Sequence, residues 1–169
     1  MIYIIVAVDQ NNGIGKDGSM PWHFTKELKN FAHTTRTTHD PELHNTVIMG
    51  RKTWESIPEK FRPLPGRNNI VLTRNAELKA DGAKVLTSLE EAIDSAEHSE
   101  KIFIIGGGSI YEQALKLPNL QGIYLTRIHK AYDCDTFFPA VPSIFSNEEI
   151  LGEDSEDGTE FSFIRFTKP

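Results

Sequence analysis

Strand-like and helix-like segments alternate along the first 128 residues, and this alternation restricts the fold more than any other feature of the chain. Short apolar runs rich in Ile and Val predict buried strands, while capping residues and Pro118 mark helix starts and a helix end. Strands are expected at residues 2–8, 46–50, 69–73, 83–86, 101–105 and 122–128, and helices at 21–31, 51–56, 88–96 and 109–117.

Beyond residue 128, β-type segments dominate. Residues 161–166 alternate enough to predict a final edge strand, and a further strand is expected between Phe145 and Leu151. The acidic run 153–157 between them is interpreted as a solvated turn. Together these features predict an α/β fold of three layers: a doubly wound, mostly parallel eight-stranded sheet with four helices over its two faces and an antiparallel hairpin at the C-terminal end. No linker interrupts the chain, so residues 1–169 are expected to form one domain.

Composition excludes several classes of function. The net charge of -6 does not favour nonspecific binding of nucleic acid or anionic membranes, and no apolar stretch approaches the ~20 residues that span a bilayer. The single cysteine, Cys134, excludes an internal disulfide and fits a reducing, cytoplasmic setting. The six histidines lack metal-ligand spacing, so no metal is expected. No hydrolase elbow or nucleotide-hydrolase phosphate loop is present, and nothing demands an interface, so a monomer is expected.

One acid stands where an apolar residue is expected. On a helix through residues 21–31, Phe24, Leu28 and Phe31 form a single apolar stripe, and Glu27 shares it. A carboxylate in that position must be paired, protonated or matched by a ligand that donates hydrogen bonds. We interpret this helix as one wall of a binding site.

Glycines and cations at strand ends point to a phosphate-bearing ligand. The strand at 101–105 runs into Gly106-Gly107-Gly108-Ser109, a turn that lets a ligand approach the backbone and directs helix N–H groups at phosphate. Gly50-Arg51-Lys52-Thr53 repeats the strand–glycine–helix geometry, and Arg74 follows another strand. These residues favour a dinucleotide with an extra phosphate, NADPH in preference to NADH.

Several ordered motifs then resemble the dihydrofolate reductase family over essentially the whole chain. They are Ile14-Gly15, Met20-Pro21-Trp22, Glu27-Leu28 with Phe31, VIMGRKTWESIP from Val47, RPLPGR from Arg62, NIVLT from Asn69, IGGGSIYE from Ile105, Leu125-Thr126 and DTFFP from Asp135. The resemblance implies NADPH-dependent reduction of 7,8-dihydrofolate to tetrahydrofolate, with hydride transfer to C6 and protonation at N5.

The resemblance also implies how the substrate is bound. Glu27 would accept hydrogen bonds from N3 and the 2-amino group of the pterin, while Trp22 and Met20 control the water that delivers the proton. Arg67 would pair with the α-carboxylate of the ligand. Thr126 would support the acid. The implied catalytic residues are Glu27, Trp22, Met20 and Thr126, and the implied substrate-binding residues are Ile5, Val6, Glu27, Leu28, Phe31, Ile57, Leu64, Arg67 and Thr126.

The cofactor side follows in the same way. The resemblance places a cis peptide bond between Gly106 and Gly107, and makes the loop 9–19, predicted to be mobile, a lid over the cofactor. The implied cofactor-binding residues are Ala7, Ile14, Gly15, Gly50, Arg51, Lys52, Thr53, Leu72, Thr73, Arg74, Ile105, Gly106, Gly107, Gly108, Ser109, Ile110 and Tyr111.

Two alternatives remain open at this point. One is another reductase on the same fold, such as the pyrimidine reductase of riboflavin synthesis, which would not need Glu27 and Phe31 together with Arg67. The other is a non-catalytic nucleotide- or folate-binding module, which would keep the glycine turns without a working acid.

Many bacterial members of the family have Asp where this chain has Glu27. The longer side chain of Glu moves the carboxylate by about 1.5 Å.

Overall fold

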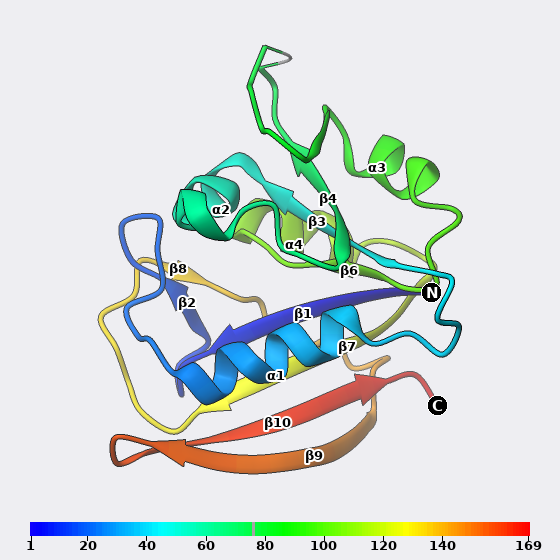
Figure 1. The fold of residues 1–169 in the computed structure, drawn as a ribbon. Helices are drawn as coiled ribbons and strands as arrows, with labels where there is room; N and C mark the ends of the chain where they lie inside the picture. Colours follow the sequence, from blue (N-terminus) through cyan, green and yellow to red (C-terminus); the bar gives the residue numbers. More distant parts are fainter. Residues whose placement is uncertain (76) are drawn as a thin grey trace.

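One eight-stranded sheet organises the protein, in the order β5-β4-β3-β6-β1-β7-β10-β9 (Figure 1). The computed structural model describes residues 1–75 and 77–169. The strands are β1 (Ile2–Val8), β3 (Asn45–Gly50), β4 (Arg67–Leu72), β5 (Lys84–Leu86), β6 (Ile102–Ile104), β7 (Leu120–Ile128), β9 (Asn147–Glu156) and β10 (Thr159–Thr167). The pairs from β5 to β7 are parallel, and β10 runs antiparallel to both β7 and β9. The predicted fold class, with its C-terminal hairpin, is therefore confirmed.

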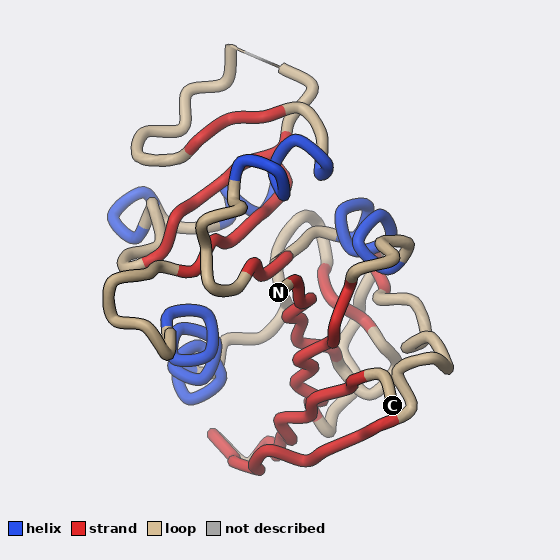
Figure 2. The backbone as a smooth tube through the Cα atoms, turned by 90° about the vertical axis from the view of Figure 1, so that its right-hand side faces the viewer, coloured by secondary structure: helices blue, strands red, loops and turns tan. Residues whose placement is uncertain are grey.

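Helices cover both faces of the sheet, as Figure 2 shows. They are α1 (Thr25–Arg36), α2 (Arg51–Ser56), α3 (Leu89–Ser95) and α4 (Gly108–Leu115), with a 3-10 turn at Glu59–Phe61. Successive strand residues point to opposite faces, so Ile4 packs with α3 and α4 while Ile5 packs on the face of α1 and α2. The result is two apolar layers separated by the sheet, as the eight-strand, four-helix prediction requires.

The strand order predicts a ligand crevice at one edge of the sheet, at the carboxyl ends of its parallel strands. Strand β6 comes late in the chain but lies between β3 and β1, so the connections leave the ends of these strands in opposite directions. The carboxyl ends of β1, β3, β4 and β6 meet at this edge because the strands are parallel. Ligands of open α/β sheets bind at such reversal points.

The C-terminal hairpin differs from the prediction in two respects. The edge strand is β9, whereas β10 lies inside the sheet between β7 and β9. The acidic run is not a turn: β9 continues to Glu156, and the turn is Asp157–Gly158, where both φ angles are positive (51° and 77°). Acidic residues suit this strand because most of its positions are exposed and because charges protect a sheet edge from pairing.

The first helix and the first loop also differ from expectation. Thr25 is the first helical residue and not the cap, and α1 continues to Arg36, beyond the predicted end at Phe31. The loop 9–19 contains β2 (Gly13–Gly15), which pairs with β8 (Thr136–Phe137) in a small second sheet. In the described part of the chain, no helix is long and apolar enough to cross a membrane.

Candidate active site

Glu27 lies in the first turn of α1 and is 7% exposed. Burial raises the pKa of its carboxyl to about 7, and a hydrogen bond with the side chain of Thr126 opposes this rise. Thr126 stands opposite Ala7 on paired strands β7 and β1. Among the described residues, no cation lies within 4 Å of the Glu27 carboxylate. The acid is buried, unpaired and able to change protonation state near neutral pH.

Trp22 supplies an unpartnered donor next to this turn. Its ring is 7% exposed and packs at 5.2 Å from the ring of Tyr132. Its Nε1 is the one buried side-chain nitrogen or oxygen, within the described residues, that lacks a hydrogen-bond partner. Buried donors are nearly always satisfied by protein, water or ligand, so this N–H marks a place for a polar molecule. Met20, two residues earlier, is 46% exposed.

Apolar side chains form a wall beside Glu27. Ile5, Phe31, Ile57 and Leu64 belong to the cluster on the α1 face of the sheet. Leu28 is 38% exposed, although it directly follows Glu27 in the same helix. Val6 is the exception among the predicted wall residues: strand alternation turns its side chain into the opposite core, with α3 and α4.

Arg67 is a buried cation at the far end of that wall. It is 8% exposed, and its Nη1 donates to Thr35 Oγ1 at 2.9 Å while its Nε donates to the Pro65 carbonyl at 3.0 Å. Burial and the nearby charge of Arg36 lower the pKa of Arg67 to about 10. No carboxylate of the described residues lies within 4 Å of it. Such a guanidinium fits a carboxylate brought by a ligand.

The glycine turn after β6 meets the end of β3. The N–H of Gly50 donates to the Gly106 carbonyl at 2.8 Å, and the Gly106–Gly107 bond is cis, as the resemblance implied. Gly106 has a φ of 123°, which favours glycine, and a Cβ there would lie 3.2 Å from the Tyr111 hydroxyl. A Cβ on Gly108 would lie 3.0 Å from Thr136 Cγ2. The glycines therefore let Tyr111 and Thr136 lie close to the backbone of this turn.

Tyr111 connects the turn to β1. Its hydroxyl lies 2.8 Å from the Ile5 carbonyl and 2.9 Å from the Ile105 carbonyl. Burial and the charge of Glu27 raise the pKa of Tyr111, so the hydroxyl remains a donor. Ser109 and Ile110 follow the turn in the first half of α4.

The predicted phosphate-binding cations are not equivalent. Arg51 forms a solvent-exposed ion pair with Glu55, one helical turn further along α2, at 2.9 Å. Lys52 and Arg74 are exposed, and no ion pair joins either of them to a carboxylate in the described part of the chain. Thr53 Oγ1 lies 3.7 Å from the Cβ position of Gly107, which places α2 against the glycine turn. Leu72 and Thr73 are buried at the end of β4.

The predicted lid is anchored at its base. Ile14 and Gly15 lie in or beside the pairing of β2 with β8. The buried Asp9 carboxylate accepts hydrogen bonds from the N–H groups of Asn11, Gly13 and Tyr132 at 2.8, 2.8 and 2.9 Å. Burial alone would raise the pKa of Asp9, but these backbone hydrogen bonds hold it below its usual value.

The sequence did not identify three buried polar residues that support the site: Thr35, Asn69 and Asp9. Thr35 accepts a hydrogen bond from Arg67. The Asn69 side chain forms hydrogen bonds with both the N–H and the carbonyl of Leu64, each at 2.9 Å. Thr35 lies eight residues after Glu27, on the same side of α1, which is a usable signal. A polar residue opening the apolar run NIVLT was the signal for Asn69.

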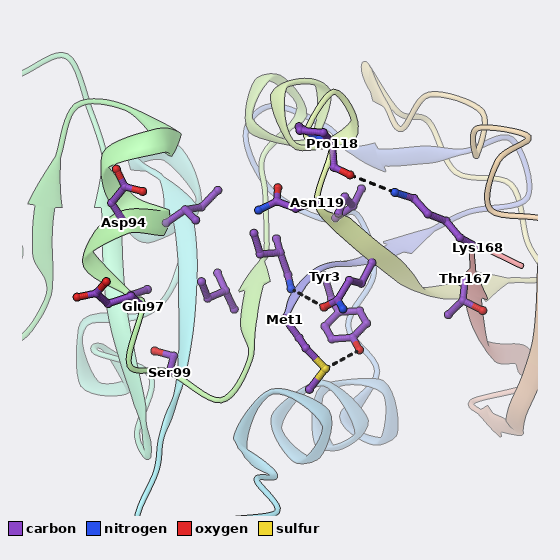
Figure 3. A pocket seen from close by; sticks show the side chains of 15 residues that line it. Met1, Tyr3, Asp94, Glu97, Ser99, Pro118, Asn119, Thr167 and Lys168 are labelled. Atoms are coloured by element: carbon purple, nitrogen blue, oxygen red, sulfur yellow. Dashed lines mark hydrogen bonds between the residues drawn. The ribbon is translucent and has the colours of Figure 1, made fainter.

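One cavity lies away from all of these residues. It has a volume of about 870 Å³, and its lining includes Met1, Tyr3, Glu97 and Lys168, where Lys168 Nζ donates to the Pro118 carbonyl at 3.3 Å (Figure 3). It opens at the amino end of β1, whereas Ala7 and Val8 at the carboxyl end of β1 mark the crevice. It contains none of the predicted site residues.

Comparison with known proteins identifies the relatives of this chain. The family model described as dihydrofolate reductase matches residues 1–168. The dihydrofolate reductase of Drosophila melanogaster is 42% identical, covering 95% of this chain and 93% of the fly protein. The dihydrofolate reductase of Heliothis virescens is also 42% identical, covering 98% and 95%.

A longer plant protein is equally similar over the same region. The bifunctional dihydrofolate reductase-thymidylate synthase 1 of Arabidopsis thaliana is 42% identical over 98% of this chain. The chain spans only 34% of the length of that plant enzyme.

Proposed function

The chain belongs to the dihydrofolate reductase family, and from this premise we propose that the crevice around Glu27 binds the pterin ring of the substrate and uses NADPH as the hydride donor. The protein is an oxidoreductase that reduces dihydrofolate to tetrahydrofolate. The family match favours this substrate over that of a riboflavin-pathway reductase, and it favours an enzyme over a passive binding module.

The single observation that carries the assignment of the site is the buried, unpaired carboxylate of Glu27. A pterin presents two adjacent donors, N3–H and the 2-amino group, and one carboxylate can accept both. Such a ligand stabilises the ionised acid, which burial otherwise disfavours. Ile5, Leu28 and Phe31 supply apolar surface on either side of the ring.

Protonation at N5 needs a donor other than Glu27, because the carboxylate is occupied at the other side of the ring. The unpartnered Nε1 of Trp22 can hold a water within the pocket. Thr126 orients the acid, and Met20 at the rim limits access of bulk water. Water exclusion and alignment are the contributions expected of the protein.

Arg67 binds the α-carboxylate of the glutamate portion of the substrate. Its Nη1 and Nε are already directed by Thr35 and Pro65, so the plane of the guanidinium is fixed before the ligand arrives. A preorganised, buried guanidinium pairs with a carboxylate bidentately, which an ammonium group cannot do.

NADPH fits the residues on the other side of the crevice. The turn 106–108 carries no side chains, so a pyrophosphate can approach its backbone, and Lys52 and Arg74 offer positive charge for the additional phosphate. The bound cofactor supplies the hydride. The residues around the nicotinamide position are Ala7, Ile14, Gly15, Ile105 and Tyr111. The remainder of the cofactor site is formed by Gly50, Thr53, Leu72, Thr73, Ser109 and Ile110.

We further propose that the protein acts as a monomer in the cytoplasm, on a small-molecule substrate and without nucleic-acid or membrane partners. The acidic charge and the single cysteine support this setting.

The direct test measures the loss of absorbance of reduced nicotinamide when purified protein is mixed with dihydrofolate. NADPH should be consumed in proportion to the tetrahydrofolate formed, and NADH should serve much less well at equal concentration. Folded protein that consumes neither cofactor would contradict the assignment, and equal use of both would contradict the choice of NADPH.

A further inference from the structure

Helix α1, which carries Glu27, has no capping side chain of its own. The N-cap residue is Phe24, which offers no acceptor, so the N–H groups of the first turn need partners from elsewhere. The Glu156 carboxylate provides them: it accepts from the N–H of Thr25 at 2.8 Å and from the N–H of Lys26 at 3.0 Å. The residue that caps the helix thus comes from the end of β9, 131 residues away in sequence.

A second pair of contacts strengthens the same junction. Lys26 Nζ donates to Asp154 Oδ1 at 3.2 Å and to the Ser155 carbonyl at 2.9 Å. The β9–β10 turn lies at the end of the molecule where α1 begins (Figure 1). The backbone hydrogen bonds from Lys26 and Thr25 hold the pKa of Glu156 below its usual value, so the cap is ionised at neutral pH.

The junction acts on the residue that follows it. Glu27 is the next residue after Lys26, and its carboxylate is directed by the same helical turn. An uncapped first turn frays, which would let Glu27 leave its buried position for water. Because the burial of Glu27 is unfavourable once it is ionised, the turn must be held by contacts outside the pocket.

We propose that Glu156 is a positioning residue: its carboxylate fixes the first turn of α1 and so holds Glu27 in place against the pterin ring. This proposal rests on the role proposed for Glu27. The acidic run 153–157, interpreted from the sequence as a solvated turn, would then contribute to the reaction through Glu156.

The variant Glu156→Ala removes both acceptor oxygens. Its kcat should fall by roughly 3- to 10-fold, the scale of a lost helix cap, and its KM for dihydrofolate should rise, whereas its KM for NADPH should stay unchanged. Glu156→Gln keeps one acceptor and should recover part of the loss; it also replaces the alanine variant if that protein does not fold. Glu153→Gln is the matched control: it lies on the same strand, is exposed and makes no side-chain hydrogen bond in the described residues.

A double variant separates positioning from general stability. In a Glu27→Gln background, Glu156→Ala should reduce kcat by less than twofold, because the group it positions has been replaced. A full additive loss in that background would overturn the proposal. So would unchanged kinetics in Glu156→Ala, or equal damage to both ligands with a matching loss of thermal stability. If Glu27→Gln alone were nearly as active as the parent, the role of Glu27 itself would fail.

Discussion

At the scale of a single residue, the central feature is a carboxyl group that the fold makes less acidic. Burial raises the pKa of Glu27 from 4.5 to about 7. The unfolded chain therefore loses this proton at lower pH than the folded protein, and between the two pKa values the folded state binds more protons. Stability must then fall as pH rises through this window, because the ionised acid is buried without a cation to pair with it.

The variant Glu27→Gln should consequently stabilise the ligand-free protein at high pH. The gain in free energy of unfolding should approach about 3 kcal/mol near pH 8 and vanish near pH 4. Urea unfolding of the parent and the variant at both pH values measures it. A gain that is equal at the two pH values would show that the acid titrates normally.

Arg67 allows a second test at this scale. Arg67→Leu removes the buried guanidinium, so KM for dihydrofolate should rise by roughly 30-fold or more, as for loss of one member of a buried ion pair. KM for NADPH should change little because the residues proposed to bind the cofactor belong to the other side of the proposed crevice. Steady-state kinetics with dihydrofolate and NADPH varied in turn measures the two KM values separately. An equal rise in both would refute the role assigned to Arg67.

At the scale of elements, local signals in the sequence predicted some ends well and others poorly. Helix α2 occupies the predicted residues, and Ser88 caps α3 through its hydroxyl, which accepts from the Glu91 N–H at 3.1 Å. Thr25 is not the cap because the helix begins one residue earlier than a cap at Thr25 requires, and its own N–H and that of Lys26 are bound by a carboxylate from β9. Partners distant in sequence leave no local pattern, so this exchange was not predictable.

Lys52 at the start of α2 and Arg74 just after β4 should determine whether the protein prefers NADPH or NADH. In the double variant Lys52→Gln/Arg74→Gln, KM for NADPH should rise by about tenfold while KM for NADH stays nearly constant, because only NADPH carries the extra phosphate. Lys84→Gln is the control, since Lys84 is exposed and lies at the amino end of β5, away from the proposed phosphate site. An equal rise for both cofactors would place the phosphate site elsewhere.

At the scale of the whole molecule, strand–helix alternation was enough to predict the sheet, its parallel core and its hairpin. It did not reveal that β10 is an internal strand. The segment FSFIRF alternates as an edge strand does, and only the pairing of β10 with β9 puts it inside the sheet. The small β2–β8 sheet was also missed, since both of its strands are too short to show a period. For the site, glycines and charges indicated a dinucleotide, but most individual residues came from the family resemblance.

The solution mass provides a test at the same scale. Light scattering on the purified protein should give a mass close to 19.1 kDa, with no dependence on concentration. A mass near twice that value would show that an interface exists which neither the sequence nor the fold led us to expect.

The measurement that bears most directly on the central claim is the turnover of Glu27→Gln with NADPH and dihydrofolate as a function of pH. The neutral amide cannot accept both pterin hydrogen bonds as the charged carboxylate can, so turnover near pH 7 should fall by roughly 100-fold or more. It should recover partly near pH 5, where substrate can enter already protonated. Near-normal turnover at neutral pH would show that Glu27 is an ordinary first-turn acid and that the site lies elsewhere.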